Sequence, residues 1–166
     1  MTTFKKQITV NASKQKVWDV LSDLGGVMKF HPGVKKSYYT TDQTEGIGAA
    51  RICELAPMGK IEETAVSWKD GESYTLKIDP IEKAPPVKDF LVEILLIEKG
   101  ANQVVVSFNV SYDMKLGFIG TLLNKIVIRS QMETGITGLL QGMKIYAEKG
   151  TEIKDNSALK KLLKAA

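Results

Sequence analysis

An arginine and a glutamate are the residues of this chain whose types and spacing most suggest chemistry. Arg51 and Glu63 flank the sequence Ala-Pro-Met-Gly, which is typical of a tight turn. For a hairpin that turns at Pro57-Met58, the predicted register sets Cys53 opposite Ile61 and Arg51 directly opposite Glu63. Such a pair can hold the polar end of a ligand, or act as an anion site with a general base, or form a buried ion pair that satisfies itself.

A second hairpin determines the surroundings of this pair. Asp70-Gly71 between alternating segments is a strong hairpin signal, because both central residues of a type I′ turn need positive φ. A two-residue turn there pairs Lys69 with Glu72, and the same register places Ser67 opposite Tyr74. Since side chains alternate between strand faces, one mostly apolar face is predicted to consist of Arg51, Cys53, Leu55, Ile61, Glu63, Ala65, Ser67, Tyr74, Leu76 and Ile78.

Other reactive side chains are few. His31 is the only histidine, and it precedes Pro32 at the end of a predicted helix, either at the mouth of a cavity or on a surface loop. A single histidine allows no His-rich metal site, so we expect no metal and no other cofactor. Cys53 is the only cysteine, which excludes an internal disulfide. With no histidine close in sequence, it is predicted to be a small buried side chain and not a nucleophile.

The first part of the chain predicts one strand and two short helices. Residues 4–10 alternate between apolar and polar types, as a half-buried strand does. Ser13 is a suitable N-cap for a helix that ends near Ser22, and Asp23 can cap a second short helix. Residues 34–41, rich in tyrosine and threonine, predict the next strand.

The second half predicts a third hairpin and a long helix. Strand patterns cover residues 87–98 and 103–113, and a 3.6-residue period runs from about 118 to 149. One helix with polar residues and glycines cannot fully cover a curved antiparallel sheet, so this α+β order predicts space between them. The glycines indicate close backbone approach, a kink, or a break near residues 134–138, and they are Gly120, Gly135, Gly138 and Gly142.

Composition is that of one ordinary globular domain. The chain has 166 residues, 43% hydrophobic and 25% charged, with a net charge of +4. We expect one domain over residues 1–150 and a basic tail over 151–166. No pattern of interleaved aromatic and arginine residues favours nucleic acid. No apolar run is long enough for an integral membrane segment, and the N-terminus lacks a signal sequence, so we expect a cytoplasmic protein.

Several stretches, in a characteristic order, carry a family resemblance. They are residues 8–13, 17–23 and 31–34, then Gly48-Ala49-Ala50-Arg51, Ile61-Glu62-Glu63, Asp70, and a terminal helix opened by Gly117. Over about residues 3–149 they resemble the START/Bet v 1-like (SRPBCC) superfamily, in its polyketide cyclase/dehydrase and lipid-transport branch. The resemblance implies a helix-grip fold. In this fold a seven-stranded curved antiparallel sheet wraps around a long C-terminal helix, two short helices follow the first strand, and a hydrophobic cavity lies between sheet and helix.

The resemblance also bears on the charged pair. In this family the arginine of the Gly-x-x-Arg piece and the glutamate of the next strand commonly point into the cavity, and they correspond to Arg51 and Glu63. In lachrymatory-factor synthases a comparable pair carries proton transfer, whereas in hormone receptors of this fold it lines a ligand pocket. The fold alone does not decide between these roles.

The sequence therefore predicts binding or transport of a hydrophobic small molecule, such as a lipid, isoprenoid, quinone or polyketide-like compound, by a monomer or homodimer. The alternative is a cyclase, dehydratase or isomerase in which Glu63, Tyr112 or His31 moves a proton and Arg51 assists. A third possibility is an interaction module that docks through the basic tail. The residues predicted to contact a ligand are Arg51, Glu63, His31, Tyr74, Phe90, Phe108 and Tyr112.

Overall fold

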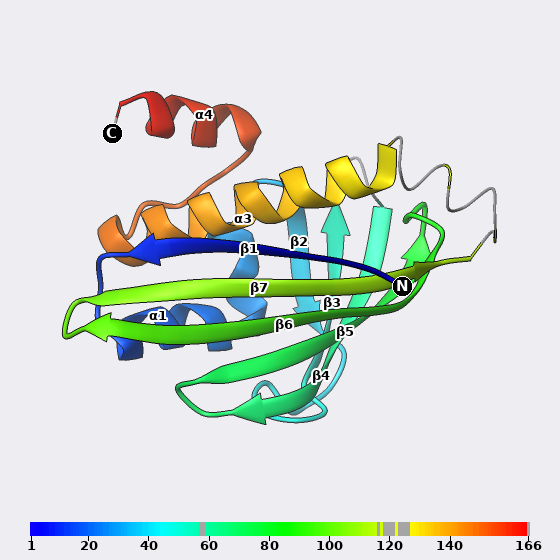
Figure 1. Ribbon diagram of the computed structural model, residues 1–166, viewed down its shortest axis with the longest axis horizontal. Helices are drawn as coiled ribbons and strands as arrows, with labels where there is room; N and C mark the ends of the chain where they lie inside the picture. Colours follow the sequence, from blue (N-terminus) through cyan, green and yellow to red (C-terminus); the bar gives the residue numbers. More distant parts are fainter. Residues whose placement is uncertain (57–58, 116, 118–121, 123–126, 166) are drawn as a thin grey trace.

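A single antiparallel sheet forms the body of the protein (Figure 1). The computed structural model describes residues 1–56, 59–115, 117, 122 and 127–165. The sheet has the predicted seven antiparallel strands, and their order is β1-β7-β6-β5-β4-β3-β2. The strands are β1 (Thr2–Val10), β2 (Val34–Tyr39), β3 (Ala50–Leu55), β4 (Gly59–Lys69), β5 (Ser73–Glu82), β6 (Val87–Gly100) and β7 (Gln103–Met114).

Two short helices follow β1, and both predicted caps are confirmed. Helix α1 (Lys14–Ser22) begins after Ser13, whose side chain accepts a hydrogen bond from the Lys16 amide. The 3₁₀-helix η1 (Leu24–Lys29) begins after Asp23, whose side chain accepts from the Gly26 amide at 3.0 Å. Each cap satisfies an amide that the first helical turn leaves without a partner.

The register of the two adjacent hairpins is confirmed around the charged pair and wrong at one turn. Arg51 pairs with Glu63, and Glu63 pairs with Ile78, as expected. At Asp70-Gly71, however, Lys69 pairs with Ser73 and not with Glu72. Gly71 takes the positive φ that the turn needs.

Because this turn is longer than the predicted two residues, Ser67 pairs with Thr75 and not with Tyr74. An irregularity between Ala65 and Ser67 then restores the expected register, with Ala65 opposite Leu76. A β-bulge of this kind adds one residue to one strand and leaves the pairing beyond it intact.

Helix α3 (Arg129–Lys149) lies along β1 and closes the inner side of the sheet (Figure 1). It is continuous through residues 134–138, so the break, one of the three predicted alternatives, does not occur there, whereas a close backbone approach is found at Gly142. Most of the predicted segment between 118 and 126 lies outside the described residues. Gly150, with φ 70°, ends the helix, and its amide bonds the Tyr146 carbonyl oxygen, a common helix terminus.

The predicted basic tail contains a short helix that packs on the domain. Helix α4 (Asn156–Lys164) is capped by Asp155, whose side chain accepts from the Ala158 amide at 2.8 Å. Leu159 is buried against Ile145 and Ile153 on the outside of α3 (Figure 1). The lysines remain exposed, at Lys154, Lys160, Lys161 and Lys164.

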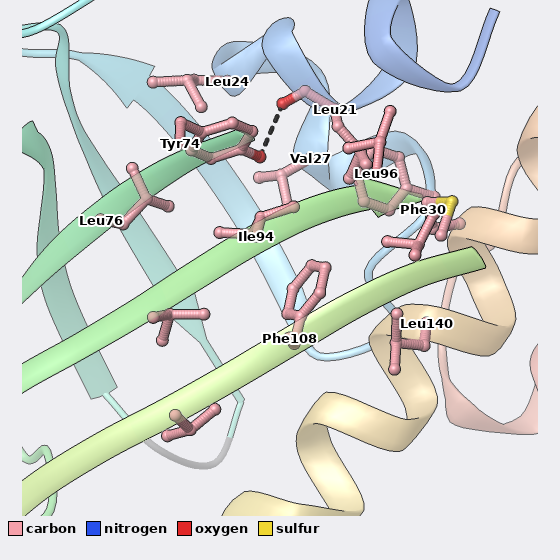
Figure 2. Close-up of a cluster of buried hydrophobic side chains, with 14 of the residues drawn as sticks. Leu21, Leu24, Val27, Phe30, Tyr74, Leu76, Ile94, Leu96, Phe108 and Leu140 are labelled. Atoms are coloured by element: carbon pink, nitrogen blue, oxygen red, sulfur yellow. Dashed lines mark hydrogen bonds between the residues drawn. The ribbon is translucent and has the colours of Figure 1, made fainter. Parts of the chain in front are cut away.

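The core lies between the sheet, the short helices and the C-terminal part of α3 (Figure 2). Figure 2 shows the Tyr74 hydroxyl donating to the Leu21 carbonyl oxygen, at 2.9 Å, which joins β5 to α1. The inner side chains of β7 are buried as predicted, and they are Val104, Val106, Phe108, Val110 and Tyr112.

Two glycines of α3 provide a test of the packing. A Cβ at Gly142 would lie 2.0 Å from the Phe30 carbonyl oxygen, whereas a Cβ at Gly135 would meet nothing within 4 Å. We expect Gly142→Ala to lower the free energy of unfolding by about 1–3 kcal/mol, because the backbone must move. Gly135→Ala should raise it by up to about 1 kcal/mol, because alanine favours helix. Urea unfolding measures both, and equal effects would contradict this packing.

Candidate functional site: an apolar cavity with one buried ion pair

A cavity of about 430 Å³ lies between the sheet and α3. This volume is within the range of small-molecule sites. Its wall is mainly apolar and includes Val27 and Phe30 near η1, Leu76 and Ile94 in the sheet, and Ile136 in α3. The predicted space between the sheet and the helix is therefore present.

Small residues of α3 leave this space open. Ser130, Thr134, Gly135 and Gly138 contribute to the cavity wall from the N-terminal half of the helix. At Gly135 no atom lies within 4 Å of the position a Cβ would occupy. The glycines of α3 therefore have two different roles. Gly135 leaves space in the cavity, and Gly142 allows a close backbone contact with Phe30.

Arg51 and Glu63 form a buried ion pair in the cavity wall. Arg51 Nε donates to Glu63 Oε2 at 2.6 Å. Arg51 Nη1 donates to the Leu24 carbonyl oxygen, so a backbone group of η1 also orients the guanidinium. The two residues are 6% and 9% exposed, and β3–β4 pairing holds their backbones opposite each other.

Electrostatics keep Arg51 charged and the neighbouring Cys53 thiol neutral. Burial works against the charge of Arg51, but Glu63 outweighs it and raises the pKa of the guanidinium above its ordinary value. Burial also raises the pKa of the Cys53 thiol to about 12. Cys53 is 2% exposed, and its Sγ lies 3.4 Å from Glu63 Oε2. The prediction of a small buried cysteine is confirmed.

His31 lies in the loop between η1 and β2, is half-buried, and lines the cavity, as one of the two predicted alternatives has it. Its Nδ1 accepts a hydrogen bond from the Gly33 amide at 3.0 Å, which places the proton of the neutral ring on Nε2. Burial is the main cause that lowers the pKa of His31 to about 4. At neutral pH this side chain is therefore an uncharged imidazole.

The four aromatic candidates divide into two groups. Tyr74, Phe90 and Phe108 line the cavity. Tyr112 does not line it; it is fully buried and its ring packs against Phe90 with centroids 5.8 Å apart. Burial raises the pKa of the Tyr74 phenol, and its hydroxyl proton is directed to Leu21.

Some residues of the site were not predicted from the sequence. The Leu24 carbonyl oxygen belongs to a helix whose contact with Arg51 is not visible in local patterns. Met132 and Leu139 line the cavity, and their seven-residue spacing, with Ile136 between them, is a helical signal that could have found them. The described residues contain no group of three or more His, Cys, Asp or Glu side chains placed to hold a metal ion.

The chain matches a protein family over most of its length. The family model described as polyketide cyclase/dehydrase and lipid transport matches residues 1–148, and the chain belongs to this family. A sequence comparison with curated proteins finds no match. The predicted polyketide cyclase/dehydrase and lipid-transport family is confirmed by this match, and the predicted helix-grip fold is confirmed by the structure.

Solved structures share the fold at low sequence identity. A protein from Thermus thermophilus superposes with a TM-score of 0.70 and 16% identity, over 88% of this chain and 97% of the other. A START superfamily protein from Mycobacterium smegmatis has a TM-score of 0.65 and 11% identity, over 84% and 94%. Norcoclaurine synthase from Thalictrum flavum, in complex with dopamine and hydroxybenzaldehyde, has a TM-score of 0.62 and 15% identity, over 84% of both chains.

A double-mutant cycle tests the buried pair. Glu63→Leu alone should lower the free energy of unfolding by about 3–5 kcal/mol, because it leaves the Arg51 charge buried without a partner. Adding Arg51→Met should recover most of that loss, as urea unfolding would show. The exposed pair Lys69–Glu72, with side chains 68% and 50% exposed, is the control, and its coupling should stay below about 1 kcal/mol. Additive effects at Arg51 and Glu63 would contradict a buried ion pair.

The pH dependence of stability tests His31. Its folded-state pKa lies below that of the unfolded chain, so the unfolded chain binds more protons as the pH falls from 6.5 towards 4. Stability is complete above pH 6.5 and is lost as the pH falls through this window. Between pH 7.5 and 5 the loss specific to His31 should reach up to about 2 kcal/mol.

His31→Asn is the matched variant for this measurement, because asparagine keeps an acceptor for the Gly33 amide but does not titrate. The wild type should lose more stability than His31→Asn between the two pH values in urea unfolding. Parallel losses would show that His31 is not buried as an uncharged ring.

Proposed function

We propose that this protein binds an apolar small molecule in the cavity, with the polar end of the ligand at Arg51 and Glu63. The observation that carries the proposal is an apolar cavity of about 430 Å³ with a buried ion pair in its wall. A wall of this kind removes apolar ligand surface from water, and a few polar groups determine the ligand's orientation. Lipids, isoprenoids, quinones and polyketide-like compounds fit this description.

Family membership supports the same proposal at a general level. The family is described by both lipid transport and polyketide cyclase/dehydrase activity, and both descriptions involve largely apolar molecules. None of the described helices is long and apolar enough to cross a bilayer. The cytoplasmic location and the monomeric or dimeric state remain predictions.

Catalysis as a cyclase, dehydratase or isomerase is less well supported by the geometry. Glu63 already accepts hydrogen bonds from Arg51 and Cys53. The low pKa of His31, about 4, makes it a weak base, and the Tyr74 proton is directed to Leu21. Tyr112, the other predicted proton donor, does not line the cavity.

The third possibility, docking through the basic tail, has little support in the packing. The apolar side of α4 is turned towards α3 through Leu159. The lysines of α4 are exposed together with Leu163, and exposed lysines on a helix are ordinary solvated residues.

Filling the cavity tests the proposed binding. Native mass spectrometry should show co-purified apolar molecules, and the uncharged dye Nile red should bind with a rise in fluorescence. Gly135→Leu should weaken dye binding at least about tenfold, because a side chain there enters open cavity space.

Gly135→Ala is the matched control, since it changes the same position but fills little of the cavity, and it should bind the dye almost as the wild type does. A spectrum without bound mass, together with no dye uptake, would overturn the proposal.

A further inference from the structure

We propose that the ligand's polar end is an uncharged hydroxyl group, which donates to Glu63 and accepts from Arg51, and that the cavity discriminates against carboxylates. This inference deepens the proposed function and rests on it. It names a ligand class, neutral amphiphiles such as long-chain or polycyclic alcohols, where the cavity alone indicates only an apolar molecule.

The described wall of the cavity carries no net charge. Among the described residues that line the cavity, Arg51 and Glu63 are the only ones that carry formal charge. They lie 2.6 Å apart, so their charges cancel within the wall. A ligand carboxylate would enter an apolar space with no unpaired cation, and it would lose its hydration without compensation.

Arg51 and Glu63 retain donor and acceptor groups that can still form hydrogen bonds with a ligand. An arginine side chain has five N–H donors, and a carboxylate accepts through two oxygens. The hydrogen bonds among the described residues use Nε and Nη1 of Arg51 and only Oε2 of Glu63. The side chains keep 7% and 12% of their surface exposed, and both line the cavity.

A hydroxyl group matches this pattern because it can donate one hydrogen bond and accept others at a single oxygen. A carboxylate can only accept, and it would meet the like charge of Glu63. An ether accepts but leaves Glu63 without a donor.

Besides Arg51 and Glu63, the titratable side chains of the described wall are His31, Cys53 and Tyr74. At neutral pH His31 is uncharged because burial holds its pKa low. Cys53 and Tyr74 are also uncharged, since burial raises the pKa of each. None of these groups supplies the positive charge that a carboxylate would need.

Displacement of Nile red by three dodecyl compounds at pH 7.5 tests this inference. Dodecan-1-ol, dodecanoate and dodecyl methyl ether share one chain and differ only at the polar end. We expect dodecan-1-ol to bind at least about tenfold more tightly than dodecanoate, and about fivefold more tightly than the ether.

Glu63→Gln provides the decisive variant. It leaves the Arg51 charge without its counter-charge, so dodecanoate should gain at least about tenfold in affinity and the preference for dodecan-1-ol should disappear. Glu93→Gln is the matched control, because Glu93 bonds Asn109 and does not line the cavity. It should keep the wild-type order of affinities.

Each outcome decides one of the two proposals. If Nile red binds and dodecanoate displaces it as well as or better than dodecan-1-ol, the preference for a hydroxyl is wrong while the binding function stands. If Nile red binds and no dodecyl compound displaces it, the proposed ligand class is also wrong. If Nile red and the dodecyl compounds all fail to bind, the binding function itself fails. Should Glu63→Gln not fold, the wild-type order alone decides.

Discussion

The structure depends on one constraint: a single helix must cover the inner face of a seven-stranded sheet. Helix α3 meets this constraint unevenly along its length. Its C-terminal part fills the core with Leu140, Met143 and Ala147, and Gly142 lets the backbone lie against Phe30. Its N-terminal part presents small residues, so apolar strand residues there face space. The cavity is therefore a consequence of how one helix is fitted to a curved surface.

Within this cavity the ion pair is unusual, because burying two charges costs much of what their attraction returns. A self-satisfied pair would contribute little to stability, so its presence in an otherwise apolar wall is better explained by a ligand. The pair is also held from three elements, β3, β4 and the Leu24 carbonyl oxygen of η1. Such support keeps donors and acceptors oriented when the site is empty, which lowers the cost of binding.

Local sequence rules predicted the strand pairing correctly around Arg51 and Glu63 and wrongly at the Asp70-Gly71 turn. Turn residues around Pro57-Met58 indicated the hairpin, and the predicted pairing of Arg51 with Glu63 is confirmed. At Asp70-Gly71 the same rules gave a turn that is too short, because one residue more or less changes little in the local pattern. The irregularity between Ala65 and Ser67 compensates for the longer turn, so the error did not reach Glu63.

The residues that line the cavity were also only partly identified from the sequence. Six of the seven residues predicted to contact a ligand line the cavity, and Tyr112 does not. Phe90 and Tyr112 could not be separated by sequence, since both fall on inward positions of adjacent strands. The β6–β7 register shifts between Lys88 and Leu91, at Phe90, and Phe90 lines the cavity whereas Tyr112 is fully buried. Their roles in ligand binding remain predictions.

The sequence by itself determined the strands, the helix caps at Ser13 and Asp23, and the pairing of Arg51 with Glu63. All of these follow from side-chain alternation, turn residues and capping, which involve near neighbours in the chain or across one hairpin. Only the tertiary structure decided that His31 faces the cavity, that Gly142 and Gly135 serve opposite needs, and that α4 packs on α3. These depend on where a helix settles against a curved sheet, and that position is the result of many long-range contacts acting together.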